Sequence, residues 1–209
     1  MIFRQLFDAN SSTYTYLLGC ADTREAVVID PVYEQHARDT ALIRELDLKV
    51  RYVLDTHVHA DHVTGAWLLR EALGAQIVLS KRCGVENVDV PVDHGDVLAF
   101  GNCSLMVRAT PGHTDGCLTY VTKTQDMAFT GDCLMIRGAG RTDFQAGDEH
   151  VMWRSIRDQI FSLPDDCLIY PGHDYAGRTV STVAEEKQFN PRIGGDAREH
   201  LERSMKVWN

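Results

Sequence analysis

One short segment constrains this chain more than any other: the apolar run Val50–Asp55 leads directly into Thr56-His57-Val58-His59-Ala60-Asp61-His62. The run has the apolar and β-branched residues of a buried strand. In extended backbone, side chains two residues apart point the same way, so His57 and His59 can face one point. Imidazoles together with a carboxylate suit zinc, iron or manganese. The segment therefore predicts a metal site at the end of a β-strand.

Three more ionisable residues occupy the same kind of position. His113 follows the expected strand Ser104–Ala109, Asp132 follows Met127–Thr130, and His173 follows Cys167–Tyr170. Both of these histidines come directly after a Pro-Gly pair, which fixes a tight turn. Loops at strand ends are where a rigid scaffold presents catalytic groups, so we expect four strand ends to meet at one rim. Ligand count alone leaves open a second metal ion, held by Asp61, His62 and His173 with Asp132 as the bridge.

The rest of the pattern predicts strands in both halves of the chain, with helices between and after them. The strands expected in the first half are Ile2–Phe7, Thr13–Leu18, Glu25–Asp30, Val50–Asp55 and Gln76–Leu79, with helices Gln35–Asp47 and Val63–Leu73. Those of the second half are Val97–Phe100, Ser104–Ala109, Leu118–Thr122, Met127–Thr130 and Cys167–Tyr170, with helices Glu149–Leu163, Thr179–Phe189 and Asp196–Val207. No Gly-, Ser- or Pro-rich linker separates the halves. We expect an α+β fold of two packed sheets with helices outside, forming a single domain over residues 1–209.

Charge and composition exclude some classes of partner. A net charge of −9 argues against nucleic acid, whose binding needs a basic footprint, but leaves room for a local basic pocket that binds a small anion. No run of about 18 apolar residues could cross a membrane. The start of the chain, Met1–Asp8, lacks the apolar stretch of a signal peptide. We expect a cytoplasmic protein whose six scattered cysteines are reduced.

The ordered set of candidate ligands resembles a known family. Thr56–His62, His113, Asp132 and His173, in that order, look like the metallo-β-lactamase superfamily, and the match runs through the whole chain. The resemblance implies an αββα sandwich, with two mixed β-sheets inside, helices outside and the metal site at one edge of the sheets. A metal site at the edge of the sheets agrees with the prediction that the ligands lie at the ends of strands.

Further segments narrow the resemblance to one group. Gly138-Ala139-Gly140-Arg141-Thr142-Asp143-Phe144-Gln145 and His173-Asp174-Tyr175-Ala176-Gly177 closely resemble the persulfide dioxygenases, also called sulfur dioxygenases. Four further segments are similar to the same group: Thr13–Leu18, Ile29–Val32, Thr179–Thr182 and Asn190–Arg192. Ala139 departs from the pattern, since we expect relatives to carry a cysteine there. The difference removes a thiol and leaves the expected metal ligands in place.

The resemblance implies a reaction. In this group one iron(II) is bound by the residues matching His57, His113 and Asp132, and this facial triad leaves positions open for a sulfur ligand and O2. The residues expected around the centre, where they orient ligands and hold water, are His59, Asp61, His62 and His173. The implied substrate is glutathione persulfide, which O2 and water convert to sulfite and glutathione.

Glutathione carries two carboxylates, so its binding needs cationic partners even on an acidic protein. Arg141 is the first candidate because it stands in a glycine-flanked loop close to Asp132 in sequence, and Tyr175 and Arg178 come next, just after His173. A structural ion pair would explain Arg141 equally well. A homodimer is compatible with the sequence.

Two other functions remain open. Glyoxalase II, a binuclear hydrolase of glutathione thioesters, shares the ligand order but normally carries a helical C-terminal domain that supplies much of the glutathione site. Only 36 residues follow His173 here, enough for two helices, which counts against that function. The third alternative is a nucleic-acid-processing or purely binding member of the superfamily, which the acidic charge and the intact ligand set disfavour.

Overall fold

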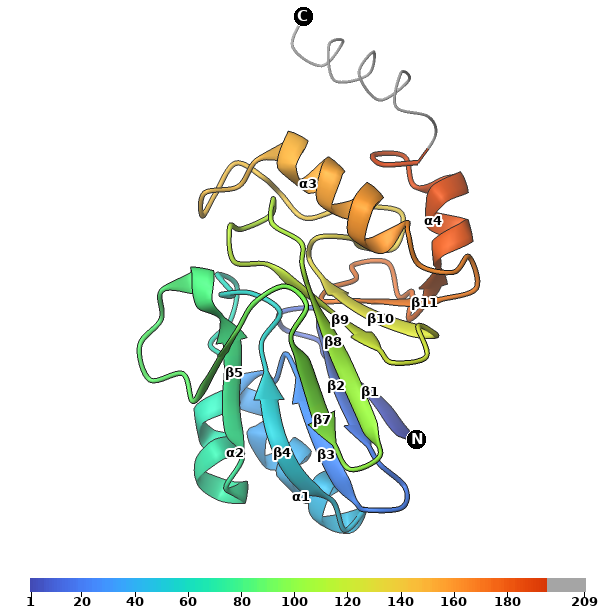
Figure 1. The fold of residues 1–209 in the computed structure, drawn as a ribbon. Coiled ribbons are helices and arrows are strands. Elements are labelled where there is room, and N and C mark those ends of the chain that lie inside the picture. Colours follow the sequence, from blue (N-terminus) through green and yellow to red (C-terminus); the bar gives the residue numbers. More distant parts are fainter. Residues whose placement is uncertain (195–209) are drawn as a thin grey trace, which may run out of the picture.

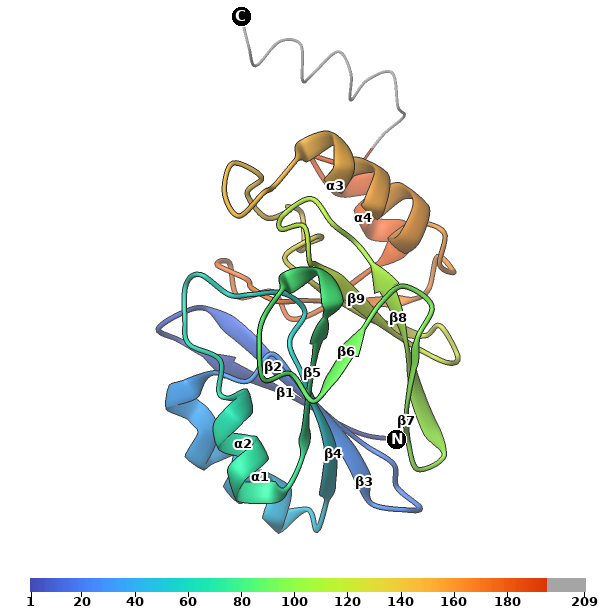
Figure 2. The same ribbon diagram turned by 60° about the vertical axis from the view of Figure 1, so that its left-hand side comes forward.

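The computed structural model describes residues 1–194, which form two six-stranded β-sheets packed against each other (Figures 1 and 2). The first sheet keeps its strands in chain order: β1 (Ile2–Asp8), β2 (Thr13–Gly19), β3 (Glu25–Ile29), β4 (Lys49–Leu54), β5 (Gln76–Ser80) and β6 (Val90–Val92). β1, β2 and β3 pair antiparallel, whereas β3 to β6 pair parallel. The sheet is therefore mixed.

The second sheet has the order β12-β11-β10-β9-β8-β7. Its strands are β7 (Val97–Phe100), β8 (Cys103–Ala109), β9 (Leu118–Thr122), β10 (Met127–Gly131), β11 (Leu168–Pro171) and β12 (Ser181–Thr182). Four of the pairings are antiparallel and one, β10 with β11, is parallel. The prediction of two mixed sheets is confirmed.

Helices cover the outer face of each sheet, as Figure 1 shows. α1 (His36–Glu45) and α2 (Ala66–Leu73) lie against the first sheet, and α3 (Glu149–Ser155) and α4 (Val183–Phe189) lie against the second. Two short 3-10 turns, Tyr33–Gln35 and Lys81–Cys83, join these elements. The layers run helix, sheet, sheet, helix, as the family resemblance implied.

The period-two alternation of the strands builds this layering, because successive side chains of a strand point to opposite faces. In β3, Val27 and Ile29 enter the core between the sheets, whereas Ala26 and Val28 pack toward α1 and α2. β9 does the same in the second sheet, with Tyr120 facing the central core and Val121 facing α3. Both sheets are thus buried on two sides.

Several element boundaries differ from those expected. The helix expected over Val63–Leu73 begins at Ala66, and the one expected over Thr179–Phe189 begins at Val183, where the Thr182 hydroxyl caps it by accepting from the Glu185 amide at 3.1 Å. Residues 181–182 instead pair with β11. β6 was not predicted; it is an edge strand, the position in a sheet at which Pro91 is tolerated.

The helix expected over Glu149–Leu163 changes character half-way. α3 ends at Ser155 and continues as a π-helix, Ile156–Ile160, with the Phe161 amide bonded to the Ile156 carbonyl at 2.8 Å. The wider turn places the side chains of Ile156 and Phe161 in the same apolar core. The helix expected at Asp196–Val207 lies outside the described residues, so a single domain over 1–209 stays a prediction. Within residues 1–194, no helix is long and apolar enough to cross a membrane.

Candidate metal centre

Four strand ends deliver the expected ligands to one rim of the sandwich. β4 runs into Asp55-Thr56-His57, β8 into the turn that carries His113, β10 into Asp132 and β11 into His173. One ligand atom each from His57, His113 and Asp132 lies within 4.8 Å of the others. The first sheet contributes one of these groups and the second sheet contributes two, so packing of the two sheets assembles the site.

A relay from Asp30 orients the ring of His57. The buried Asp30 carboxylate accepts from the Thr56 amide at 2.7 Å and from the Thr56 hydroxyl at 2.9 Å. Since that hydroxyl gives its proton to Asp30, it accepts from Nδ1–H of His57 at 2.9 Å. Nε2 of His57 is then the nitrogen left for a metal. Burial lowers the His57 pKa to about 3, so the ring is neutral, as a ligand must be.

A backbone carbonyl orients His113 in the same way. Nδ1 of His113 donates to the Arg141 carbonyl oxygen at 2.7 Å, which leaves Nε2 free. The contact needs glycine at position 140, because a Cβ there would lie 2.7 Å from this ring nitrogen. Gly112, with φ of +137°, supplies the turn that the Pro-Gly pair predicted.

The two carboxylate oxygens of Asp132 lie next to different histidines. Its Oδ1 accepts from Nδ1 of His173 at 2.7 Å, and its Oδ2 lies 3.7 Å from Nε2 of His113. Burial alone would raise the Asp132 pKa, but the hydrogen bond and charge of His173 lower it to about 2. The carboxylate is therefore ionised, with Oδ2 directed to the side where His113 lies.

His173 stands beside this triad and bridges two carboxylates. Besides the bond to Asp132, its Nε2 donates to Asp61 Oδ2 at 2.9 Å and lies 3.0 Å from the Thr13 hydroxyl. Burial would lower the His173 pKa, but the bonds to Asp132 and Asp61 raise it to about 10. In the metal-free chain His173 is thus an imidazolium.

His59 and His62 keep one unused nitrogen each. Nε2 of His59 donates to Asp30 at 3.2 Å, and Nδ1 of His62 donates to Asp61 at 2.8 Å. The remaining nitrogens, Nδ1 of His59 and Nε2 of His62, are buried without a hydrogen-bond partner among the described residues. Ligand atoms of His59, Asp61 and His62 also lie within 4.8 Å of one another. These free nitrogens can accept from a water or bind an ion.

Asp30 is a functional residue that the sequence did not single out. It ends the strand expected over Glu25–Asp30 and directly follows the observed β3, so the strand-end rule used for the other ligands could have found it. Its backbone has φ of +50°, a left-handed conformation that Asp tolerates better than most residues. This single carboxylate orients His57 through Thr56 and accepts directly from His59. The two rings therefore have opposite tautomers, with the proton on Nδ1 of His57 and on Nε2 of His59.

A cleft of about 970 Å³ opens beside the triad. Asp61, His113, Asp132 and His173 line one end of it, and the arginines that line it are Arg137, Arg141, Arg178 and Arg192. On a chain with a net charge of −9, these four arginines make the cleft the candidate site for an anion, although Asp61, Asp132 and Asp174 also line it.

The predicted substrate residues all reach this cleft. Arg141 forms a two-pronged ion pair with Asp143 at 2.8 and 3.0 Å, and both side chains are about two-thirds exposed or more. Arg178 donates to the Ile136 carbonyl at 2.8 Å. Tyr175 is 74% exposed, and its ring lies parallel to that of His173 at 6.1 Å.

Two of the four arginines were not predicted. Arg137 pairs with Glu185 at 2.6 Å and with Glu186. Arg192 donates to the carbonyl of Ala139 at 3.2 Å, within the loop that carries Arg141. The Asn190–Arg192 segment, noted only as a family resemblance, therefore lies against this loop. Ala139 itself is buried in the core near α3.

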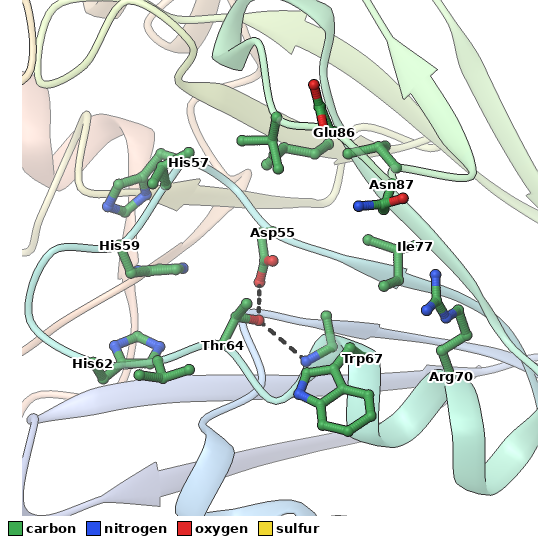
Figure 3. A pocket seen from close by; sticks show the side chains of 16 residues that line it. Asp55, His57, His59, His62, Thr64, Trp67, Arg70, Ile77, Glu86 and Asn87 are labelled. Carbon is green, nitrogen blue, oxygen red and sulfur yellow. Dashed lines mark hydrogen bonds between the residues drawn. The ribbon is translucent and has the colours of Figure 1, made fainter.

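A second, apolar cavity of about 580 Å³ lies beside the same histidine segment (Figure 3). It is lined by His57, His59 and His62 and by residues of α2, β5 and the 85–88 segment, and it shares no lining residue with the arginine cleft. His57 therefore borders one cavity, while His113 and Asp132 border the other.

With this geometry in place, comparison with known proteins decides the family. Residues 10–83 and 80–173 match the metallo-beta-lactamase superfamily. The chain belongs to this superfamily. Its ligand-bearing strand ends are all inside the matched residues.

Within the metallo-beta-lactamase superfamily, the chain is similar to proteins named for one activity. It is 53% identical over 194 residues to the mouse protein named "Persulfide dioxygenase ETHE1, mitochondrial", covering 92% of this chain and 76% of the relative. A crystal structure of ETHE1 from Myxococcus xanthus superimposes with a TM-score of 0.93 at 51% identity, over 100% of this chain and 92% of that one.

A more distant relative carries the name of the alternative activity. The "Hydroxyacylglutathione hydrolase" of Polaromonas sp. is 35% identical over 192 residues, covering 89% of this chain and 72% of the relative. The difference in identity favours the dioxygenase group over the hydrolase group.

Proposed function

We propose that this chain is an iron-dependent persulfide dioxygenase, which oxidises glutathione persulfide with O2 and water to sulfite and glutathione. The observation that carries the proposal is the convergence of His57, His113 and Asp132, with each histidine bonded at Nδ1. Similarity to the persulfide dioxygenase named above supports the same activity.

The residues present fit one iron(II) ion per chain. Two imidazoles and one carboxylate are the ligands of the non-haem iron oxygenases, and the lowered pKa values of His57 and Asp132 keep that ring neutral and that carboxylate ionised, as metal ligands must be. When bound there, iron(II) would supply open positions for the persulfide sulfur and O2 and a path for electrons between them.

The chain's own residues hold this centre in shape. Thr56 and the Arg141 carbonyl fix the two histidine rings, and His173 holds one oxygen of Asp132 so that the other stays available. Such supporting hydrogen bonds orient metal ligands and raise their basicity. They hold the ligand atoms of His57, His113 and Asp132 within 4.8 Å of one another, as a single bound metal ion would need.

The arginine cleft would bind the glutathione part of the substrate. Its two carboxylates are anions, and Arg141 and Arg178 present guanidinium groups beside the triad. The Arg141–Asp143 pair is exposed and contributes little to stability, so Arg141 can exchange Asp143 for a substrate carboxylate at small cost. Tyr175 offers an exposed ring next to His173 that can cover the substrate backbone.

His59 and His62 would serve the water that the reaction consumes. Their free nitrogens are buried acceptors, and a buried water needs two or more polar partners. A water held there would lie beside Asp61, whose carboxylate could orient it by accepting a hydrogen bond.

The binuclear thioester hydrolase remains the second candidate because His59, Asp61 and His62 form another ligand cluster. An oxygen electrode and a sulfite assay separate the two activities. We expect the protein to consume O2 and release sulfite in equal amounts with glutathione persulfide, and to leave S-lactoylglutathione largely intact. Rapid anaerobic hydrolysis of the thioester without persulfide-dependent O2 uptake would assign the chain to the hydrolases.

Cytoplasmic location and a homodimer stay predictions. The name of the mouse relative places that protein in mitochondria.

A further inference from the structure

The apolar cavity beside the histidine segment differs in its lining from the arginine cleft. Four of its lining side chains are apolar and yet exposed: Val58 at 37%, Val63 at 62%, Trp67 at 50% and Val85 at 48%. Ala66, Ile77, Leu79 and Val88 continue the apolar lining. An exposed apolar patch that lines a cavity indicates a binding site rather than chance exposure.

The charges around this cavity disfavour anions. Arg70 is its cationic lining residue, and its guanidinium lies 3.7 Å from carboxylates of both Glu71 and Asp89. Glu86 adds a negative charge to the rim. The cavity therefore has the opposite character to the cleft with four arginines.

The cavity ends at the proposed metal ligands. Figure 3 shows the rings of His57, His59 and His62 on one side of it, and Ile77, Arg70 and Asn87 on the other. Asp55 lies between them, and its carboxylate is held by the Thr64 hydroxyl at 2.9 Å. Because His57 lines this cavity while His113 and Asp132 line the cleft, the three ligands stand where the two cavities approach each other.

We propose that this apolar cavity collects O2 and delivers it to the metal position past His57, while the persulfide enters through the arginine cleft. The inference rests on the proposed dioxygenase function, whose two substrates differ in polarity. Small apolar species occupy apolar cavities, as xenon and benzene do. Separate entrances let an anion bind in the cleft without blocking the gas.

Filling the cavity tests this route. Val85→Phe and Val88→Phe add bulk at its wall, and Val85 is exposed, so that variant should fold. The matched control is Val97→Phe, an equally large change at a 63% exposed position on β7 that lines neither cavity. We expect the KM for O2 to rise about threefold or more in the two cavity variants, with kcat at saturating O2 and the KM for persulfide unchanged. Val97→Phe should leave all three constants as they are.

Xenon binding supplies a readout that does not depend on activity. Crystals of the parent protein under xenon pressure should show xenon among Ala66, Ile77 and Leu79, and Val88→Phe should lower its occupancy. Absence of xenon from this cavity, or an unchanged KM for O2 in both cavity variants, would overturn the O2 route. A rise only in the KM for persulfide would overturn it as well, by making the cavity part of the persulfide site.

These experiments distinguish a failure of the O2 route from a failure of the proposed dioxygenase function. If the parent protein shows no persulfide-dependent O2 uptake, the dioxygenase function fails and the O2 route fails with it, even where xenon binds. If O2 uptake is present and the cavity variants behave like Val97→Phe, the inference fails alone.

Discussion

The hydroxyl oxygen of Thr56 lies 2.9 Å from Nδ1 of the adjacent His57, and its own proton is committed to Asp30. The ring must therefore donate from Nδ1 and present Nε2. The same Asp30 accepts from Nε2 of His59, which leaves Nδ1 of that ring free. One buried carboxylate thus sets the tautomers of two neighbouring histidines, and this arrangement does not depend on a bound metal.

Thr56→Val should weaken the centre without unfolding the protein. The substitution preserves shape but leaves Nδ1 of His57 without an acceptor and Asp30 without one of its donors. We expect a loss of about 10–100-fold in iron affinity or activity. Competition with a chelator measures the affinity. Thr124→Val, which removes an exposed hydroxyl bonded to Asp126, is the control and should bind iron like the parent; equal affinities for all three proteins would refute the relay.

The metal content should be about one iron per chain, because the triad has the ligands of a mononuclear iron site. Elemental analysis of protein purified without added metal gives both identity and number. Two zinc ions per chain with full thioesterase activity would contradict this prediction and favour a second ion at the His59, Asp61 and His62 cluster.

Substitution of single ligands should separate two classes of residue. His57→Ala, His113→Ala and Asp132→Ala should each lose both iron and activity. His62→Ala should keep substantial iron while activity falls, because its free nitrogen contacts no member of the triad. His173→Ala should behave similarly, with a loss of about 10–100-fold, since it removes hydrogen bonds to Asp132 and Asp61 but no member of the triad. Equal metal loss in all five variants would indicate a shared two-metal site.

Local sequence patterns predicted that these side chains meet, because each lies just beyond the end of its own strand; the choice of a three-residue iron site came from the family resemblance. The apolar runs before His57, His113, Asp132 and His173 are readable along the chain, and the packing of two sheets then brings their ends together. The two packed sheets followed from the strands expected in both halves of the chain, with helices between and after them. Boundaries were less predictable where tertiary contacts decided them, as in the π-helical turn after Ser155.

Contacts between distant segments could not be predicted in this way. Arg192 reaches the Ala139 carbonyl only because Asn190 bonds to the Gly138 carbonyl at 3.0 Å and fixes the chain there. Nothing near Arg192 in the sequence indicates that loop. The apolar cavity was missed for the same reason, since its wall combines α2, β5 and the 85–88 segment.

Removal of the metal should expose a pH dependence of stability. The folded pKa of His173 is about 10, above its ordinary 6.5, so its stabilising effect is complete below pH 6.5 and is lost as pH rises through about 10. The Asp132 pKa is about 2, below its ordinary 3.8, so its effect is lost only as pH falls through about 2. Metal-free protein should therefore melt at a lower temperature as pH rises from 6.5 to 10, by about 2–4 °C for each kcal/mol lost.

A comparison of His173→Gln with His150→Gln tests whether His173 causes this pH dependence of the melting temperature. His150 is exposed, so its variant should keep the parent's decline in melting temperature. His173→Gln should flatten the decline over the same range. A parallel decline in all three metal-free proteins would show that groups other than His173 cause it.

Arg141→Lys tests the assignment of the cleft to a substrate carboxylate. Lysine keeps the charge but loses the planar fork that can bind a carboxylate with two parallel bonds, so the KM for glutathione persulfide should rise. The melting temperature should change little, because the Arg141–Asp143 pair is exposed. Arg82→Lys is the matched control: Arg82 is also exposed and lies 3.7 Å from Asp115, but it does not line the cleft. A lowered melting temperature with an unchanged KM would make Arg141 a structural residue, and the glutathione carboxylates would then have to bind the other arginines of the cleft.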